Sequence, residues 1–269
     1  MPELDSAPLA AVILAGERQL RDALRSHFGV PSKALIAIGG EPMIHRVIGA
    51  LRRAETVGEL WLSGPVREAV EADPRLARDI AAGELAWRPP AATPATSAAA
   101  VMAEIPAERR VLLTTADHPM LSPEVVDHFC RESLASGADV TVGLAPYALV
   151  QERFPALKKT VLEFRDGDFC GCNLFAFLTP RGRRVADFWR RIENQRKKPM
   201  RLIRLLGWWS VVRYRLGLLS LESALAHLSG ILDLRIRPVV LPYAHAAVDV
   251  DSLDDYQVLA EAAMAAQLP

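Results

Sequence analysis

The sequence has little of what marks secreted, disulfide-stapled or nucleic-acid-binding proteins. Its 269 residues include only three cysteines, which form no even disulfide framework and fit a reducing compartment. Lys and Arg together number 32, as do Asp and Glu, so the net charge is zero and nucleic acid is not an expected partner. Residues 1–8 contain no apolar stretch, so we expect no signal peptide and a cytoplasmic protein.

The composition also excludes extensive disorder. Hydrophobic residues make up 51% of the chain and charged residues 24%, the balance of an ordinary globular protein. The length fits either one large α/β domain or two small ones. We expect a single domain over residues 1–269, with a basic, Trp-rich helical insertion at about 181–230.

Strand-like and helix-like segments alternate along the chain. Residues 9–15 are a continuous apolar run, as in a strand buried on both faces of a parallel sheet, and residues 110–115 form the clearest predicted strand. The pattern predicts an α/β fold with a Rossmann-like, doubly wound, mostly parallel sheet. The other predicted strands are 59–62, 85–87, 139–144, 160–164, 173–177, 234–241 and 246–250. The predicted helices are 42–54, 65–80, 97–104, 123–136, 181–195, 221–228 and 253–267.

Two acidic sites follow apolar runs that are far apart in the sequence. Asp117 follows the run 111–116, and Asp249 and Asp251 lie in the run 246–251. Carboxylates at the C-terminal ends of parallel strands lie where open α/β sheets bind ligands, and their oxygens suit Mg²⁺. The alternative is that Asp117 caps a helix starting near Ser122 and that Asp251 caps one starting near Leu253.

Three further motifs accompany these sites. Residues 14–21 read Leu-Ala-Gly-Glu-Arg-Gln-Leu-Arg, residues 31–35 read Pro-Ser-Lys-Ala-Leu, and residues 39–43 read Gly-Gly-Glu-Pro-Met. Together with the two acidic sites they resemble the MobA-like nucleotidyltransferases, which include molybdopterin guanylyl- and cytidylyltransferases and methylerythritol-phosphate cytidylyltransferases. The resemblance covers residues 9–145 and 246–265 and is thin between them.

The resemblance implies a nucleotide-diphospho-sugar transferase type of fold and a Mg²⁺-dependent activity. An NTP, with CTP favoured, would be coupled to a phosphorylated small-molecule acceptor with release of pyrophosphate. Arg21 and Lys33 match the family's two basic positions and would be the catalytic cations. Leu14, Ala15 and Gly16 would bind the nucleotide together with Lys33, because a glycine-containing loop lets backbone N–H groups approach phosphate.

Two more residues match family positions. Ser97 corresponds to a serine that contacts the nucleotide, although a helix N-cap would look the same in sequence. Asn173 lies where the family places an asparagine that faces the acceptor, although a turn asparagine is an alternative. Asp117, Asp249 and Asp251 are the candidate metal ligands.

Glu17 and Gln19 stand where the family has glycines. A carboxylate at position 17 would repel phosphate unless it points away. Two other functions therefore stay open. One is a catalytically degenerate protein that binds nucleotide, and the other is a nucleotide-sugar glycosyltransferase, which a D-x-D motif also fits.

The segment 181–215 is strongly basic. It holds twelve Lys and Arg against Asp187 and Glu193, a local charge of +10. Residues 202–221 are apolar, but burying their three arginines in a bilayer would cost about 2.5 to 3.5 kcal/mol each, so a spanning helix is not expected. Tryptophans beside arginines favour peripheral contact with an anionic membrane through 199–221. The alternatives are packing over the acceptor pocket and a homodimer face.

Overall fold

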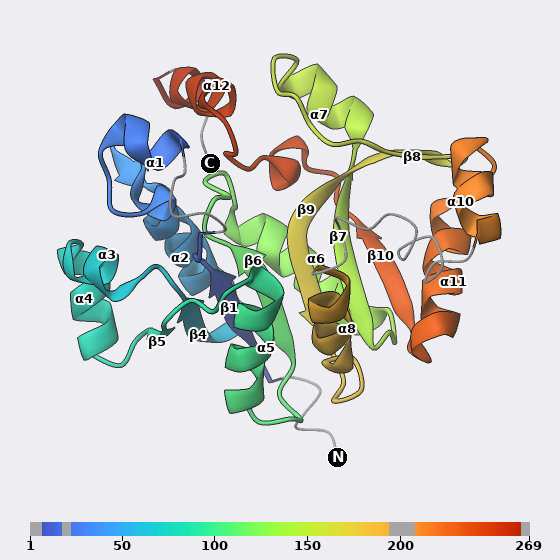
Figure 1. Ribbon diagram of the computed structural model, residues 1–269, viewed down its shortest axis with the longest axis horizontal. Coiled ribbons are helices and arrows are strands. Elements are labelled where there is room, and N and C mark those ends of the chain that lie inside the picture. Colours follow the sequence, from blue (N-terminus) through green and yellow to red (C-terminus); the bar gives the residue numbers. More distant parts are fainter. Residues whose placement is uncertain (1–6, 18–22, 194–207, 265–269) are drawn as a thin grey trace.

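A computed structural model describes residues 7–17, 23–193 and 208–264 as a mixed sheet with helices on both faces (Figure 1). The strands are β1 (Leu9–Leu14), β2 (Ala37–Ile38), β3 (Glu41–Pro42), β4 (Val57–Ser63), β5 (Ala86–Arg88), β6 (Val111–Thr115), β7 (Val140–Pro146), β8 (Leu162–Phe164), β9 (Gly167–Phe177) and β10 (Ile236–Val240). The helices are α1 (Ala23–Phe28), η1 (Lys33–Leu35), α2 (Met43–Arg53), α3 (Arg67–Glu71), α4 (Pro74–Ala81), α5 (Pro94–Glu104), α6 (Pro123–Ala135), α7 (Tyr147–Arg153), α8 (Arg184–Glu193), α10 (Trp208–Arg215), α11 (Leu221–Leu232), η2 (Ala244–Ala247) and α12 (Leu253–Met264).

The main sheet runs in the order β10-β7-β9-β6-β1-β4-β5, and β8 pairs with β9. β1 is parallel to β4 and β6, and the pairs β4–β5 and β7–β10 are parallel as well. Only β9 among these strands runs against its neighbours β6, β7 and β8. The sheet is therefore mostly parallel and wound with helices on both sides, which confirms the predicted fold class.

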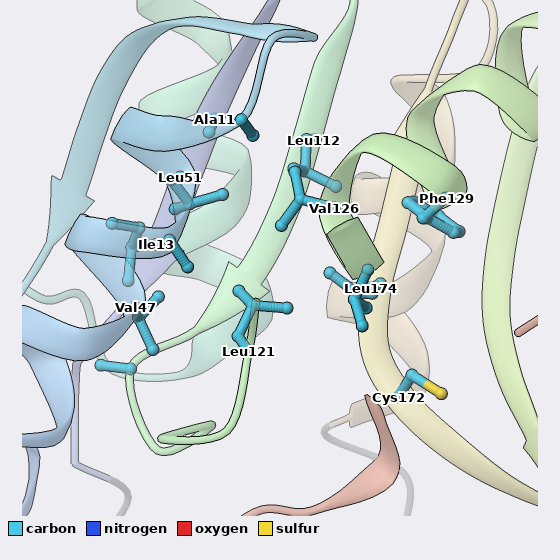
Figure 2. Packing of buried hydrophobic residues seen from close by; sticks show 14 of the residues in the cluster. Ala11, Ile13, Val47, Leu51, Leu112, Leu121, Val126, Phe129, Cys172 and Leu174 are labelled. Carbon is cyan, nitrogen blue, oxygen red and sulfur yellow. The ribbon is translucent and has the colours of Figure 1, made fainter. Parts of the chain in front are cut away.

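Strand β1 shows why its sequence is a continuous apolar run. Every residue of β1 is buried, and alternate side chains enter different core clusters on the two sides of the sheet. The odd-numbered residues meet α2 and α6, and the even-numbered ones meet α5. Figure 2 shows the first of these clusters, where Val47 and Leu51 of α2 lie near Ile13.

A third apolar cluster ties the C-terminal segment to the turn after α1. Ile36 and Ile38 are buried there with Val248, Val250 and other residues near them. The rings of Phe28 in α1 and Tyr256 in α12 also pack together, with centroids 4.4 Å apart. This cluster brings η1 next to the segment that leads into α12, although more than 200 residues separate them in sequence.

The predicted strand at 246–250 is wrong. Residues 244–247 form η2, and Val248 and Val250 are buried in the third cluster without joining the sheet. The amide of Val250 donates to the carbonyl of Asp117 at 3.0 Å. The alternation of apolar residues in this segment therefore reflects burial beneath α12 and does not reflect pairing in the sheet.

Other boundaries also differ from the prediction. The helix expected at 65–80 is split into α3 and α4, because Asp73 caps α4 by accepting hydrogen bonds from the amides of Arg75 and Leu76, and Pro74 starts the new helix. Helix α5 begins at Pro94, so Thr93 is its N-cap and Ser97 is not. Strand β9 begins six residues before the expected start at 173.

The basic insertion contains α8, α10 and α11, and its residues 194–207 lie outside the described part of the chain. Helices α8 and α11 cover the sheet through Ala186, Leu225 and Leu228. Tyr214 of α10 packs edge-on against Phe164 of β8, with ring centroids 5.7 Å apart. Over the described residues, no helix combines the length and the apolar character needed to cross a membrane. The organisation as one domain with an insertion stays a prediction.

Candidate active site

Lys33 joins two acidic segments that are far apart in sequence. Its Nζ lies 2.9 Å from Oδ2 of Asp117 and 2.9 Å from Oδ1 of Asp251. Asp117 follows β6 at the C-terminal end of the strand, and Asp251 precedes α12. The carboxylates differ in exposure, since the Asp117 side chain is 26% exposed and that of Asp251 is 72% exposed. Lys33 and two of the three aspartates predicted as site residues therefore lie together in the structure.

Lys33 and Asp117 stabilise one another's charge. Burial alone would lower the pKa of the Lys33 ammonium, but Asp117 and Asp251 outweigh it and raise the pKa above its usual range. Burial alone would raise the pKa of the Asp117 carboxyl, but Lys33 holds that pKa below its usual range. Both groups therefore stay charged at neutral pH, as phosphate chemistry requires.

Neither aspartate is a helix cap. Ser122 caps α6 by accepting from the amide of Val125. At α12, Ser252 and Asp255 cap one another's amides, and Asp255 also accepts from the amide of Asp251. The capping alternative is therefore wrong for Asp117 and Asp251, whose carboxylates point to Lys33 instead.

Asp249 belongs to a second ion pair beside the first. Its Oδ1 is bonded to Nζ of Lys159, and its Oδ2 accepts from Nδ2 of Asn173 at 2.9 Å. The two aspartates of the D-x-D motif therefore pair with different lysines. Asp251 pairs with Lys33, and Asp249 pairs with Lys159. No sequence motif pointed to Lys159, which lies in the loop between α7 and β8.

A bulge in β9 presents Asn173 to this site. Between the pairs Val142–Phe175 and Leu144–Gly171, β7 advances two residues and β9 four. Within the bulge Asn173 has a φ of 51°, a left-handed conformation that asparagine tolerates better than most residues. The bulge directs the amide towards Asp249, the arrangement expected of a residue that faces the acceptor.

The Glu17 carboxylate is bound by two donors of the protein. Its Oε1 accepts from the backbone amide of Lys33 at 2.8 Å, and its Oε2 pairs with Nη1 of Arg25 at 3.0 Å. The carboxylate therefore ties the loop after β1 to the turn that carries Lys33. Both carboxylate oxygens therefore have donor partners within the protein, and Glu17 itself lies in the lining of a small depression next to Gly16. Gln19 and Arg21 lie outside the described residues, so the catalytic role of Arg21 stays a prediction.

The predicted nucleotide-binding residues Leu14, Gly16 and Ser97 line one small depression. Ser97 is buried on α5, and its Oγ accepts from the amide of Ala91 at 2.9 Å, which fixes the Pro-rich loop over the depression. Gly64 packs against the loop after β1. A Cβ on Gly64 would lie 2.8 Å from the backbone of Ala15 and Gly16, so only glycine fits there.

The donor set fits Mg²⁺ if the nucleotide supplies further ligands. Within the described residues, no three His, Cys, Asp or Glu side chains group closely enough to hold a metal by themselves. Mg²⁺ in nucleotide sites commonly uses only one or two carboxylates plus phosphate oxygens and water. Asp117 suits this use, because its Oδ1 is buried and has no hydrogen-bond partner among the residues that the structure describes.

Comparison with known proteins agrees with this geometry. The family model for the MobA-like NTP transferase domain matches residues 11–162. Among solved structures, a hypothetical transferase from Thermus thermophilus is 30% identical, with a TM-score of 0.77 over 93% of this chain and 99% of its own. A search of curated proteins found no match.

Two cytidylyltransferases share the fold at lower identity. CMP:2-keto-3-deoxy-manno-octonic acid synthetase in complex with CTP is 16% identical, with a TM-score of 0.56 over 98% of this chain and 100% of its own. The 4-diphosphocytidyl-2C-methyl-D-erythritol synthase of Anaerococcus prevotii is 13% identical, with a TM-score of 0.54 over 96% of each chain. The chain belongs to the MobA-like NTP transferase family and is a nucleotidyltransferase.

Proposed function

We propose that the enzyme couples an NTP, with CTP favoured, to a phosphorylated small-molecule acceptor. An oxygen of the acceptor phosphate attacks the α-phosphorus, the bond to the oxygen that bridges the α- and β-phosphorus breaks, and pyrophosphate leaves with the electron pair. The observation that carries the proposal is the contact of Lys33 with both Asp117 and Asp251 beside the nucleotide loop. The choice of CTP is supported by the two cytidylyltransferases that share this fold.

Each side chain has a distinct task in this account. Lys33 leaves its carboxylate partners when the nucleotide binds and donates to phosphate oxygens, where charge develops during transfer. Glu17 accepts a hydrogen bond from the backbone amide of Lys33 and so fixes the position of the Lys33 backbone. Leu14, Ala15, Gly16 and Ser97 shape the nucleotide pocket, and Arg21 supplies a second cation. The acceptor phosphate is already ionised, so no general base is required.

We assign Mg²⁺ to Asp117 and Asp251. When bound, the ion would neutralise charge on the triphosphate and polarise its phosphoryl oxygens. Asp251 is the better second ligand because it shares Lys33 with Asp117 and is exposed to an incoming ion. Asp249 is less suited, since both of its oxygens are bound by Lys159 and Asn173.

The assignment of the second metal ligand predicts different Mg²⁺ dependences for variants of Asp251 and Asp249. We expect Asp251→Asn to raise the Mg²⁺ concentration for half-maximal activity by at least about tenfold, whereas Asp249→Asn should leave it near the wild-type value. A magnesium titration of pyrophosphate release at fixed NTP measures both variants. The reverse pattern, with only Asp249→Asn shifted, would exchange the assignments of the two residues.

The proposed reaction is tested with each of the four NTPs and a panel of phosphorylated acceptors, followed by pyrophosphate release. A parallel reaction contains nucleotide sugars in place of NTPs. Pyrophosphate that depends on both NTP and acceptor is the expected result. Product from nucleotide sugars alone would favour glycosyl transfer, and tight nucleotide binding without turnover on the whole panel would favour the degenerate protein.

We also propose peripheral contact with an anionic membrane through 199–221. The described end of this segment supports it, because Leu216 and Leu218 are exposed in the turn after α10, next to the exposed Arg215. Apolar side chains beside cations suit the boundary between lipid headgroups and acyl chains.

We expect the protein to sediment with vesicles that contain anionic lipid and not with neutral vesicles. The binding should weaken at high salt. Changing both Leu216→Ser and Leu218→Ser should weaken the binding. If the wild type fails to bind at low ionic strength, the membrane proposal is wrong. A dimer in analytical ultracentrifugation would then favour the homodimer face.

A further inference from the structure

Two adjacent lysines before β8 have opposite surroundings. The Lys158 side chain is 86% exposed and reaches Asp254 only at 3.4 Å. The Lys159 side chain is 10% exposed and turns into the site, where Nζ pairs with Asp249. Lys159 is therefore a second largely buried ammonium in the active site, besides Lys33, and neither the proposed metal nor the nucleotide loop uses it.

The Asp249 carboxylate holds Lys159 and Asn173 together. One carboxylate oxygen binds the ammonium and the other accepts from the amide, so two nitrogen donors are fixed side by side. An ammonium has three N–H donors and an amide nitrogen has two. In the part of the chain that the structure describes, Asp249 is the sole hydrogen-bonding partner of the Lys159 ammonium and of the Asn173 amide nitrogen. Donors therefore remain for an anionic ligand.

Structural stabilisation alone is a poor reason for this ion pair. Taking an ammonium and a carboxylate out of water costs about as much free energy as their mutual attraction returns. The pair also lies next to the reaction centre, since Asp249 and Asp251 flank Val250, whose amide is bonded to the carbonyl of Asp117. A ligand held by Lys159 and Asn173 would thus lie beside the nucleotide half of the site.

We propose that Lys159, together with Asn173, binds the phosphate group of the acceptor, and that Asp249 positions both donors. The inference rests on the proposed function, because it names the group that presents the attacking oxygen. It names the donors that would hold the phosphate group of the proposed acceptor. Lys33 then binds the phosphates of the nucleotide, and Lys159 binds the phosphate of the acceptor.

The test compares Lys159→Met with Lys158→Met, its exposed neighbour. We expect Lys159→Met to raise the KM for the acceptor by roughly 10- to 100-fold and to leave the KM for NTP unchanged, because it removes a charge that only the acceptor meets. Lys158→Met should match the wild type in both constants. An unchanged acceptor KM in Lys159→Met would overturn the proposal.

A binding experiment is independent of turnover. With Mg²⁺ and a non-hydrolysable NTP analogue filling the nucleotide pocket, inorganic phosphate should raise the Tm of the wild type and of Lys158→Met but not that of Lys159→Met. If Lys159→Met does not fold, Asn173→Gly replaces it, because glycine keeps the left-handed backbone and removes the amide. Phosphate stabilisation that survives in these variants contradicts the inference.

The two experiments separate the inference from the function. If no acceptor yields pyrophosphate but phosphate stabilisation is lost in Lys159→Met, the proposed reaction fails and the anion site stands. If pyrophosphate is released and Lys159→Met keeps the wild-type acceptor KM, the reaction stands and the assignment of Lys159 fails.

Discussion

Replacing Asp117 with Asn is expected to lower turnover by roughly 10²-fold or more while the protein stays folded. Asparagine keeps the shape of the side chain and removes the charge that a metal needs. Lys33 retains Asp251 at 2.9 Å, so its ammonium keeps an anionic partner. The measurement is the rate of pyrophosphate release at saturating NTP and magnesium, with the Tm recorded for the same samples.

The control is Asp254→Asn, which changes an exposed aspartate in the first turn of α12. It removes the same charge from the same end of the molecule without touching Lys33. We expect wild-type turnover from this variant. Wild-type turnover from Asp117→Asn as well would exclude Asp117 from the catalytic site.

Replacing Lys33 with Met is the second change with a large expected effect, a loss of turnover of roughly 10²-fold. Methionine keeps the apolar stem and removes the ammonium that would meet the phosphates. The Tm should fall by much less than the rate implies, because the Asp117 side chain is 26% exposed and water can solvate the carboxylate once its partner is gone.

Lys158→Met serves as the control, since it removes an exposed ammonium from the same protein. Rates and melting curves of the two variants separate catalysis from stability. A wild-type rate together with a lower Tm in Lys33→Met would make Lys33 a structural residue that only neutralises Asp117 and Asp251.

The parts of the fold that could be predicted are those where burial dictates residue type. Strands β1 and β6 lie inside the sheet with helices over both faces, so β1 is apolar throughout and β6 is apolar up to its two final threonines. A polar residue directly after such a run, as at Asp117, stands at the ligand-binding edge. The local sequence pattern therefore predicted the position of Asp117 at the end of β6.

The rest of the site depends on contacts that local pattern does not encode. Residues 246–250 alternate like a strand because Val248 and Val250 are buried, and burial alone does not distinguish a sheet from a segment held under a helix. Glu17 is bonded to a backbone amide 16 residues away, and Lys159 to an aspartate 90 residues away. Only the folded chain shows that the Glu17 carboxylate binds the backbone of Lys33 and that Lys159 lies in the candidate site.

The central claim is that the nucleotidyl group moves, and the position of a label tests it most directly. The purified protein is incubated with magnesium, the acceptor panel and CTP labelled either at the α-phosphate or at the γ-phosphate, and the other NTPs follow in the same design. The account predicts that the α-label appears in the acceptor product while the γ-label leaves in pyrophosphate. Transfer of the γ-label to the acceptor, or no α-label in any product with any NTP, would contradict it.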